Sequence, residues 1–429
     1  MNKRIFVFIL FAFIIRLAFG LCSEFWFEDE LQVYLLGLKF FTLKSWPYFG
    51  PDIVYTHSQL PGALQALLVG LPFFALPIPE APYIFLNILS TGSLVFFAWY
   101  CTKLFNIPWW IVFSLILFAP WTLNYSTHII NPSYVLPAAV LFFISFFELM
   151  PETKKNILSP RICFALMGFS LFWIYQLHMS WVLLVPIILF SFYIKFSFKN
   201  VLWFLIGSSV MLVLVIPTYI EYGFLGTGGT GSNLTFNYKN AGEFFTVFFR
   251  FLSLPCMELP RFLGSNTDER FSLLLKYAWV IPFAFIVAIS GMLQPLSLIF
   301  EFFRAGKNSK TAWRFVKYFT LAVFVMLYLS FLFSVKGPSS HTFYVLYPLT
   351  VIYAFYCWEK YLQRPLWKKF VFVLIVSCVL VHIVIALNGF KMRSMYADTP
   401  HGNGRMLTLK AIQEQRYEVL GSRRDGVKY

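Results

Sequence analysis

The sequence predicts an all-α polytopic membrane protein with about eleven transmembrane helices. Of the 429 residues, 59% are hydrophobic and 12% are charged, whereas soluble domains carry about 25% charged residues. Apolar runs close to the ~20 residues that cross a bilayer recur along the chain. So little polar surface excludes a soluble enzyme, a disordered chain and a nucleic-acid-binding domain.

Twelve apolar runs are candidates for spanning segments. The first follows Met-Asn-Lys-Arg and has no small-residue cleavage site after it, so we expect an uncleaved helix rather than a signal peptide. The runs cover roughly residues 5–22, 60–78, 82–102, 107–123, 133–149, 162–177, 179–194, 200–218, 277–300, 315–335, 342–358 and 369–388.

The distribution of Lys and Arg among the loops predicts how many of these runs cross the membrane. The formal charge is +15, and short loops on the inner side of a membrane collect Lys and Arg. If the N-terminus is inside and 60–78 does not cross, the inner short loops hold 15 basic residues and the outer ones only Lys336. The run 60–78 also contains Pro61, Pro72 and Pro77, which interrupt a helix. We therefore expect a re-entrant or juxtamembrane hairpin there, eleven crossings and an exterior C-terminus.

This topology predicts one transmembrane domain over residues 1–390, with two large exterior loops at about 23–80 and 219–276 and juxtamembrane helices on that side. A basic exterior tail follows over 391–429. The six cysteines are scattered and form no C-x-x-C pair, so neither a disulfide framework nor a zinc site is indicated. The Gly-rich stretch 226–232 lacks the Lys of a phosphate-binding loop and is interpreted as a flexible segment.

The first exterior loop is acidic. Residues 23–59 hold five of the 19 acids, and Glu28, Asp29 and Glu30 are adjacent, just before an apolar stretch of helical length at 31–43. That stretch is expected to lie in the membrane interface. One explanation of the acids is that they cap this helix, whose N-terminus favours negative charge. The other is that one carboxylate is a general base or acid at the membrane boundary.

These acids are followed by Tyr55 and His57 and then by Leu60-Pro61, which opens the apolar hairpin. This arrangement resembles the membrane-embedded C-type glycosyltransferases, most closely the branch of the protein mannosyltransferases and the lipid A aminoarabinose transferase. The resemblance implies that Asp29 is the catalytic base, that Glu30 is its partner, and that Tyr55 and His57 contact substrate. The family usually has two prolines after the His, and this chain has one.

A second exterior segment follows the run 107–123. Relatives in that family carry an acidic or basic residue there that faces the acceptor or a metal, and this chain has no acid between 124 and 133. The resemblance therefore assigns substrate contacts to His128 and Asn131, and the alternative is an ordinary Asn-Pro helix start. A divalent metal is possible as a cofactor, but no ligand motif is present and no residue is assigned to one.

The third segment contains Lys336, His341 and Tyr344 and resembles the family's late exterior motif, in which a basic residue faces the lipid phosphate. A cation there would stabilise charge on a departing phosphate; a lysine snorkelling from a helix end is the alternative. The stretch 241–275 is expected to form an interfacial helix that closes over the site, with Arg270 as a further phosphate contact.

The resemblance implies an inverting glycosyltransferase. It would move a sugar from a polyprenyl-phosphate donor to an acceptor hydroxyl of an unknown glycan, lipid or protein, on the periplasmic face of a bacterial inner membrane. Its partners would be the donor and membrane lipid, with no nucleic acid. One alternative is a transporter or lipid flippase, which would place ionisable residues at mid-membrane, where only Arg16 and His382 come close. The other is a surface-polysaccharide polymerase, expected to have a late Arg-rich loop.

Overall fold

The computed structural model describes residues 3–23, 28–53, 58–223, 236–258, 263–264, 267–304, 311–334, 337–338, 340–392 and 408–409. Glu28 and Asp29 are described by their backbone alone. Tyr55, His57 and Lys336, the Gly-rich stretch 226–232 and almost all of the tail 391–429 lie outside the described residues.

Within these ranges the chain forms 17 α-helices and one two-stranded sheet. The elements in chain order are α1 (Lys3–Ser23), α2 (Glu28–Leu43), β1 (Phe49–Ile53), β2 (Ser58–Pro61), α3 (Leu64–Ala75), α4 (Ala81–Leu104), α5 (Trp109–Leu117), α6 (Pro120–Asn124), α7 (Asn131–Leu149), α8 (Pro160–Tyr175), η1 (Met179–Leu184), α9 (Val185–Lys195), α10 (Phe198–Leu212), α11 (Ile216–Tyr222), η2 (Tyr238–Glu243), α12 (Phe244–Ser253), α13 (Thr267–Lys276), η4 (Ala278–Val280), α14 (Ile281–Arg304), α15 (Thr311–Phe331), η5 (Ser340–Leu346), α16 (Tyr347–Leu362) and α17 (Pro365–Met392).

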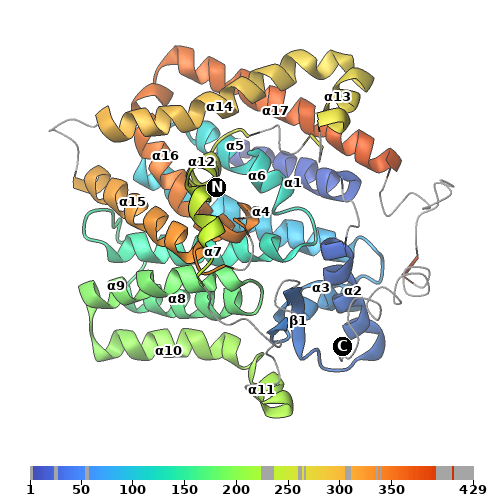
Figure 1. The fold of residues 1–429 in the computed structure, drawn as a ribbon, viewed down its shortest axis with the longest axis vertical. Helices are drawn as coiled ribbons and strands as arrows, with labels where there is room; N and C mark the ends of the chain where they lie inside the picture. The colour runs from blue at the N-terminus through green and yellow to red at the C-terminus, as the bar shows by residue number, and fades with distance from the viewer. Residues whose placement is uncertain are drawn as a thin grey trace.

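The long helices lie side by side and run across the view of Figure 1. One end of the bundle carries α2, α3 and the sheet, and we call it the α2 end. The turn between α9 and α10 lies at the other end, which we call the opposite end (Figure 1). Helix α7 runs through the middle and is 94% buried over its most apolar window. A helix that is apolar all round belongs in such an interior position.

Six helices in the described part of the chain are long and apolar enough to cross a membrane: α1, α4, α7, α14 with η4, α15 and α17. The pair α10 and α11, bent by 61°, would be a seventh. The prediction of an α-helical polytopic membrane protein is confirmed at this level. Two predicted runs are each split into two helices, at Pro120 and at Pro217, because proline lacks the N–H of a continuous helix.

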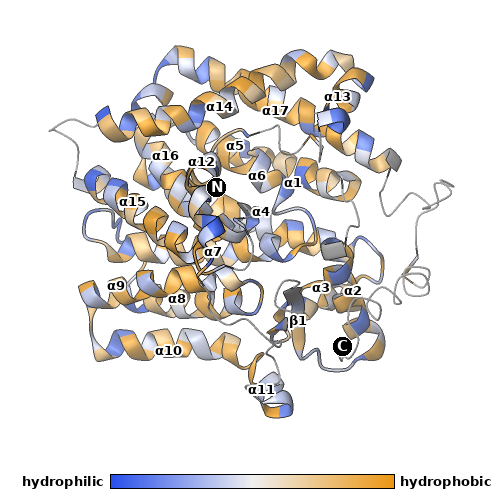
Figure 2. Ribbon diagram, viewed as in Figure 1, coloured by the Kyte–Doolittle hydropathy of each residue, from blue (hydrophilic) through white to orange (hydrophobic). Residues whose placement is uncertain are grey.

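The outer faces of the bundle are apolar. Figure 2 shows hydrophobic residues along α10, α14 and α17, where Leu205, Met292 and Phe372 are exposed. In water such surfaces would favour aggregation, whereas in a bilayer they face lipid chains. The helices α8 and α10 approach closely through small residues: a Cβ on Gly168 would lie 2.2 Å from the Phe204 carbonyl oxygen. Small residues at helix contacts are typical of membrane bundles.

The first predicted exterior loop folds into α2, α3 and the two strands. Helix α2 covers the predicted stretch 31–43, and it packs against α3 where Gly37 faces Val69 and Gly70. A Cβ on Gly37 would lie 2.5 Å from the Val69 Cβ, so only glycine allows this approach. Helix α3 has 12 residues, about 18 Å at ~1.5 Å per residue, against the ~30 Å of a hydrocarbon core.

The strands β1 and β2 pair antiparallel, with Asp52 opposite Gln59, and form a short hairpin in a structure whose described residues are otherwise mainly helical. One expectation is corrected here. The stretch 241–275 is not one helix. It is divided among η2, α12 and α13, and α12 ends at Ser253, two residues before Pro255. Helix α12 also packs against α14 and α15 rather than forming a separate interfacial element.

Candidate functional site

Asp29 lies in the first turn of α2, at the α2 end of the bundle. The next residue, Glu30, is buried, and its Oε1 accepts two hydrogen bonds. One comes from the hydroxyl of Tyr83 on α4 at 3.2 Å and the other from the backbone N–H of Ile129 at 3.2 Å. Because Glu30 joins α2 to two other parts of the bundle, it fixes the position of the turn that contains Asp29.

The segment 124–131 contacts α1, α2 and the residue Leu177 after α8. His128 is 7% exposed, and its Nδ1 donates to the Asn124 carbonyl oxygen at 2.8 Å. Its Nε2 lies 2.8 Å from the hydroxyl oxygen of Ser23 at the end of α1. The Asn131 side chain donates to the Leu177 carbonyl oxygen at 3.1 Å. Thus His128 and Asn131 both make protein contacts, and the segment is packed rather than open, while Asn131 does begin α7 as the alternative interpretation expected.

Arg16 is fully buried in α1 and does not snorkel to the interface. Its Nη1 donates to the Leu117 carbonyl oxygen at 2.7 Å, its Nε to the Thr91 hydroxyl at 3.2 Å, and its Nη2 to the Ser126 hydroxyl at 2.5 Å. Leu117 is the last residue of α5, where helix carbonyls lack intrahelical partners and favour a cation. No acid among the described residues pairs with Arg16, so its role is to tie α1 to the break between α5 and α6.

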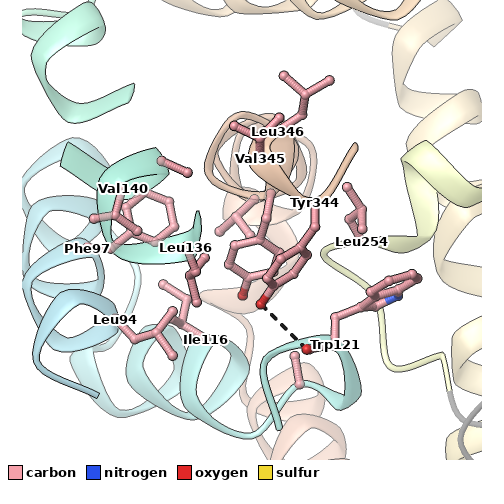
Figure 3. Close-up of a cluster of buried hydrophobic side chains, with 14 of the residues drawn as sticks. Leu94, Phe97, Ile116, Trp121, Leu136, Val140, Leu254, Tyr344, Val345 and Leu346 are labelled. Atoms are coloured by element: carbon pink, nitrogen blue, oxygen red, sulfur yellow. Dashed lines mark hydrogen bonds between the residues drawn. The ribbon is translucent and has the colours of Figure 1, made fainter. Parts of the chain in front are cut away.

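Tyr344 is buried and points from η5 into the core (Figure 3). Its hydroxyl lies 3.5 Å from the Trp121 carbonyl oxygen, and its ring centroid lies 5.7 Å from that of Tyr125. Leucines around it, among them Leu136 and Leu254, fill the remaining space (Figure 3). This environment favours a packing role for Tyr344 over the predicted contact with substrate.

His341 lies beside His178, a residue at the junction of α8 and η1. The two ring centroids are 6.1 Å apart, and the rings are nearly perpendicular. His178 accepts a hydrogen bond from the Ser180 backbone N–H at 3.1 Å. Burial, together with the neighbouring His341, lowers the pKa of His178 to about 3. His178 is therefore a neutral hydrogen-bonding group at physiological pH and not a cation for a phosphate.

Glu258 is a site residue that the sequence analysis missed. Its Oε2 accepts hydrogen bonds from the Trp121 indole N–H at 3.0 Å and the Ser253 hydroxyl at 2.8 Å. The neighbouring Met257 N–H donates to the Gln294 side chain at 2.7 Å, which anchors this turn on α14. The available signal was an isolated acid in the otherwise apolar stretch 251–260.

No described contact joins Arg270 to Glu30, Glu258 or segment 124–131. It lies on α13, and its Nε donates to the Gly264 carbonyl oxygen at 3.1 Å within the same segment. The end of α13 is bonded to α17 through Lys276 and Asn388. Among the described residues there is also no cluster of three or more His, Cys, Asp or Glu side chains that could hold a metal.

No protein-family model, curated protein or solved structure matches this chain. The resemblance to C-type glycosyltransferases therefore depends only on the residues quoted for it.

The side chains gathered here can accept and relay protons but cannot supply many fixed positive charges. Glu30 and Glu258 are carboxylates held by hydrogen bonds, and His128 and His178 have partners on at least one ring nitrogen. Ile129 in segment 124–131 donates to Glu30, and Trp121, three residues before that segment, donates to Glu258.

Proposed function

We propose that this protein is an inverting glycosyltransferase that uses a polyprenyl-phosphate-linked sugar and works on the periplasmic face of a bacterial inner membrane. The observation that carries the proposal is the position of the acidic turn of α2. Buried Glu30 holds this turn against segment 124–131, at one end of an apolar bundle. A base at this boundary can meet a lipid-linked donor from the membrane and an acceptor hydroxyl from the aqueous side.

In this reaction Asp29 takes the proton of the acceptor hydroxyl, whose oxygen attacks the anomeric carbon from the face opposite the phosphate. The bond between that carbon and the phosphate oxygen breaks, and its electron pair stays on the phosphate. One attack of this kind inverts the anomeric configuration. Lys336 and His341 are the candidates to stabilise the charge that develops on the phosphate. Glu30 acts as a positioning residue, and Arg270 is not included in the site.

The proposed topology has eleven crossings, with the N-terminus inside and the α2 end outside. Helix α3 supports the part of this topology in which 60–78 does not cross, because its 12 residues are too few to cross. The distribution of Lys and Arg supports it too, since 15 of them fall in short loops on the proposed inner side.

Transport is less well supported than group transfer. A transporter needs intramembrane ionisable groups that reach a pathway, and Arg16 and His382 are the two candidates. Arg16 has no exposed surface, and His382 is 2% exposed, with its Nδ1 2.8 Å from the Cys378 carbonyl oxygen and its ring against Phe19. Both side chains are engaged in packing the helices.

The proposal is tested with Asp29→Asn in a host that lacks the wild-type gene, with Glu28→Gln as the matched neighbouring control. A lost base lowers the rate by about 10²–10⁴-fold. We therefore expect Asp29→Asn to abolish a surface glycan modification and to accumulate its polyprenyl-phosphate donor, both measured by mass spectrometry. The amount of protein in the membrane is measured in parallel. Normal glycans and normal donor levels in Asp29→Asn cells would refute the assignment of Asp29.

A further inference from the structure

An apolar groove lies between α9 and α15, at the side of the bundle away from segment 124–131. Its volume is about 580 Å³, within the range of about 300–1,000 Å³ typical of small-molecule sites. Phe146 of α7 lies beneath it, with its ring centroid 4.4 Å from that of Phe319 and 6.5 Å from that of Phe190. Along α15 the groove extends from Thr311 to Met326, about 22 Å at ~1.5 Å per residue. That exceeds the ~15 Å of one hydrocarbon leaflet.

A second, smaller groove of about 130 Å³ lies on the other side of α15. Phe248 and Leu252 of α12 form one wall, and Ile299 and Phe302 of α14 form another. Helix α15 therefore has an apolar groove on each side, and both grooves begin near its first turns, at the opposite end of the bundle.

The mouths of these grooves are positively charged. Arg314 lines the first groove and Lys317 the second, and residues three apart on a helix have Cβ atoms about 5–6 Å apart. Neither cation forms an ion pair with a described acid. The Lys317 Nζ lies 4.3 Å from the centroid of the Phe302 ring, at the edge of the second groove.

The surrounding sequence strengthens this charge. Residues 302–358 contain no Asp or Glu, and the connection between α14 and α15 carries further lysines at 307 and 310. The nearest acid on α14, Glu301, is already bonded to Lys360 at 2.8 Å and lies 3.7 Å from Arg304. Glu152 is a lining residue of the first groove, on the loop after α7, and is the one acid among the residues that line either groove.

We propose that an anionic phospholipid binds astride the first turns of α15. Its phosphate lies between Arg314 and Lys317, one acyl chain occupies the groove between α9 and α15, and the second enters the groove between α14 and α15. Two apolar grooves that flank α15, each lined by one of two cations three residues apart, are complementary to a molecule with one anionic head and two hydrocarbon chains. Basic pockets between transmembrane helices are known to bind anionic lipid headgroups. This site lies at the opposite end from Asp29 and is independent of the proposed glycosyl transfer.

The experiment compares lipid binding to the purified full-length protein by native mass spectrometry, with phosphatidylglycerol and with phosphatidylcholine as probes. The test variant is Arg314→Ala/Lys317→Ala. The matched control, Lys195→Ala/Lys199→Ala, removes the same charge near the turn between α9 and α10, outside both sets of lining residues. Each basic residue near an anionic lipid contributes about fivefold in affinity. We expect the test variant to lose about 20- to 30-fold in phosphatidylglycerol affinity and the control to change less than about threefold.

A groove variant separates the headgroup from the chains. Ala322 lines the first groove, and Ala322→Phe fills part of it without changing charge. We expect this variant to bind both phosphatidylglycerol and phosphatidylcholine more weakly, whereas the charge variant loses affinity only for phosphatidylglycerol. Equal losses for the charge variant and its control would overturn the proposal in favour of general attraction to a basic surface. Thermal unfolding of each variant confirms that the folded protein is being compared.

Discussion

The two ends of the bundle use polar side chains in different ways. At the α2 end, Glu30 and His128 are buried, and they bond to backbone groups and hydroxyls from distant parts of the chain. At the opposite end, Glu148 is also buried and accepts bonds from the Tyr100 hydroxyl and two nearby backbone N–H groups, but basic side chains that reach the surface, such as Arg314, are present as well. Buried hydrogen bonds depend on one geometry, whereas surface charges interact with whatever anion approaches. The exposed cations, rather than the buried carboxylates, therefore distinguish the two ends.

The largest effect on stability is expected at Arg16, below the α2 end. Arg16→Leu removes the donor to the Leu117 carbonyl and to the Ser126 hydroxyl, both in the buried interior. Each unsatisfied buried group costs about 1–3 kcal/mol, so we expect the free energy of unfolding in detergent to fall by about 2–4 kcal/mol. Arg16→Lys keeps the charge but loses the forked donors of the guanidinium, so its free energy of unfolding should fall by less. A more stable Arg16→Leu protein would mean that relief of the buried charge outweighs these bonds.

Variants of Glu30 test whether hydrogen bonds to this side chain position Asp29, the proposed base. Glu30→Gln keeps an oxygen for the Tyr83 hydroxyl and the Ile129 N–H, so we expect glycan transfer within about tenfold of wild type. Glu30→Ala removes that oxygen and should cost about 1–3 kcal/mol of stability and most of the activity. If both variants were equally inactive while folded, the charge of Glu30 would be required, and it would be a partner in the chemistry.

His178 should make stability at this end depend on pH. Its folded pKa of about 3 lies below the value of about 6.5 for an unfolded chain, so the unfolded state binds more protons between these values. Stability from this group is thus fully present above pH 6.5 and is lost as the pH falls toward 3. We expect the melting temperature of His178→Asn to decline less between pH 7 and pH 5 than that of wild type. Identical declines would show that His178 is already solvated.

The smallest effect is expected at the opposite end. The Glu301 side chain is 8% exposed and pairs with Lys360, whose side chain is 51% exposed, and Glu301→Gln keeps an oxygen for its Lys360 and Tyr361 donors; pairs with one partner at the surface contribute about 0–1 kcal/mol. Glu301→Gln should therefore lower the free energy of unfolding by no more than about 1 kcal/mol, measured in the same detergent. It also frees two basic side chains, so phosphatidylglycerol binding should stay equal or become tighter. If Glu301→Gln lowered the free energy of unfolding as much as Arg16→Leu, the two ends would not differ in how strongly their polar contacts stabilise the fold.

The helices could be predicted from sequence because their signal is local: a run of apolar residues is enough to place α1, α4 or α17. The short strands could not, since β1 contains Gly50 and Pro51 and gains its partner only when the chain turns back. The contacts of Glu30 and Glu258 could not be predicted from the sequence either. They join residues 99 and 137 positions apart, and no local pattern specifies which helices meet. Helix α12 looked interfacial because its amphipathic pattern does not reveal whether lipid or another helix covers the apolar face.

The bonds of Arg16 also set an order of events during synthesis. Arg16 belongs to the first helix, but its partner Ser126 is made 110 residues later. At about 5–20 residues per second, that interval lasts roughly 5 to 20 s. During this time the first helix carries an unpartnered guanidinium, which costs about 2.5–3.5 kcal/mol at the bilayer centre. The nascent α1 is therefore expected to remain beside the insertion machinery until α4, α5 and α6 arrive, so the first helix to be made settles only after the sixth.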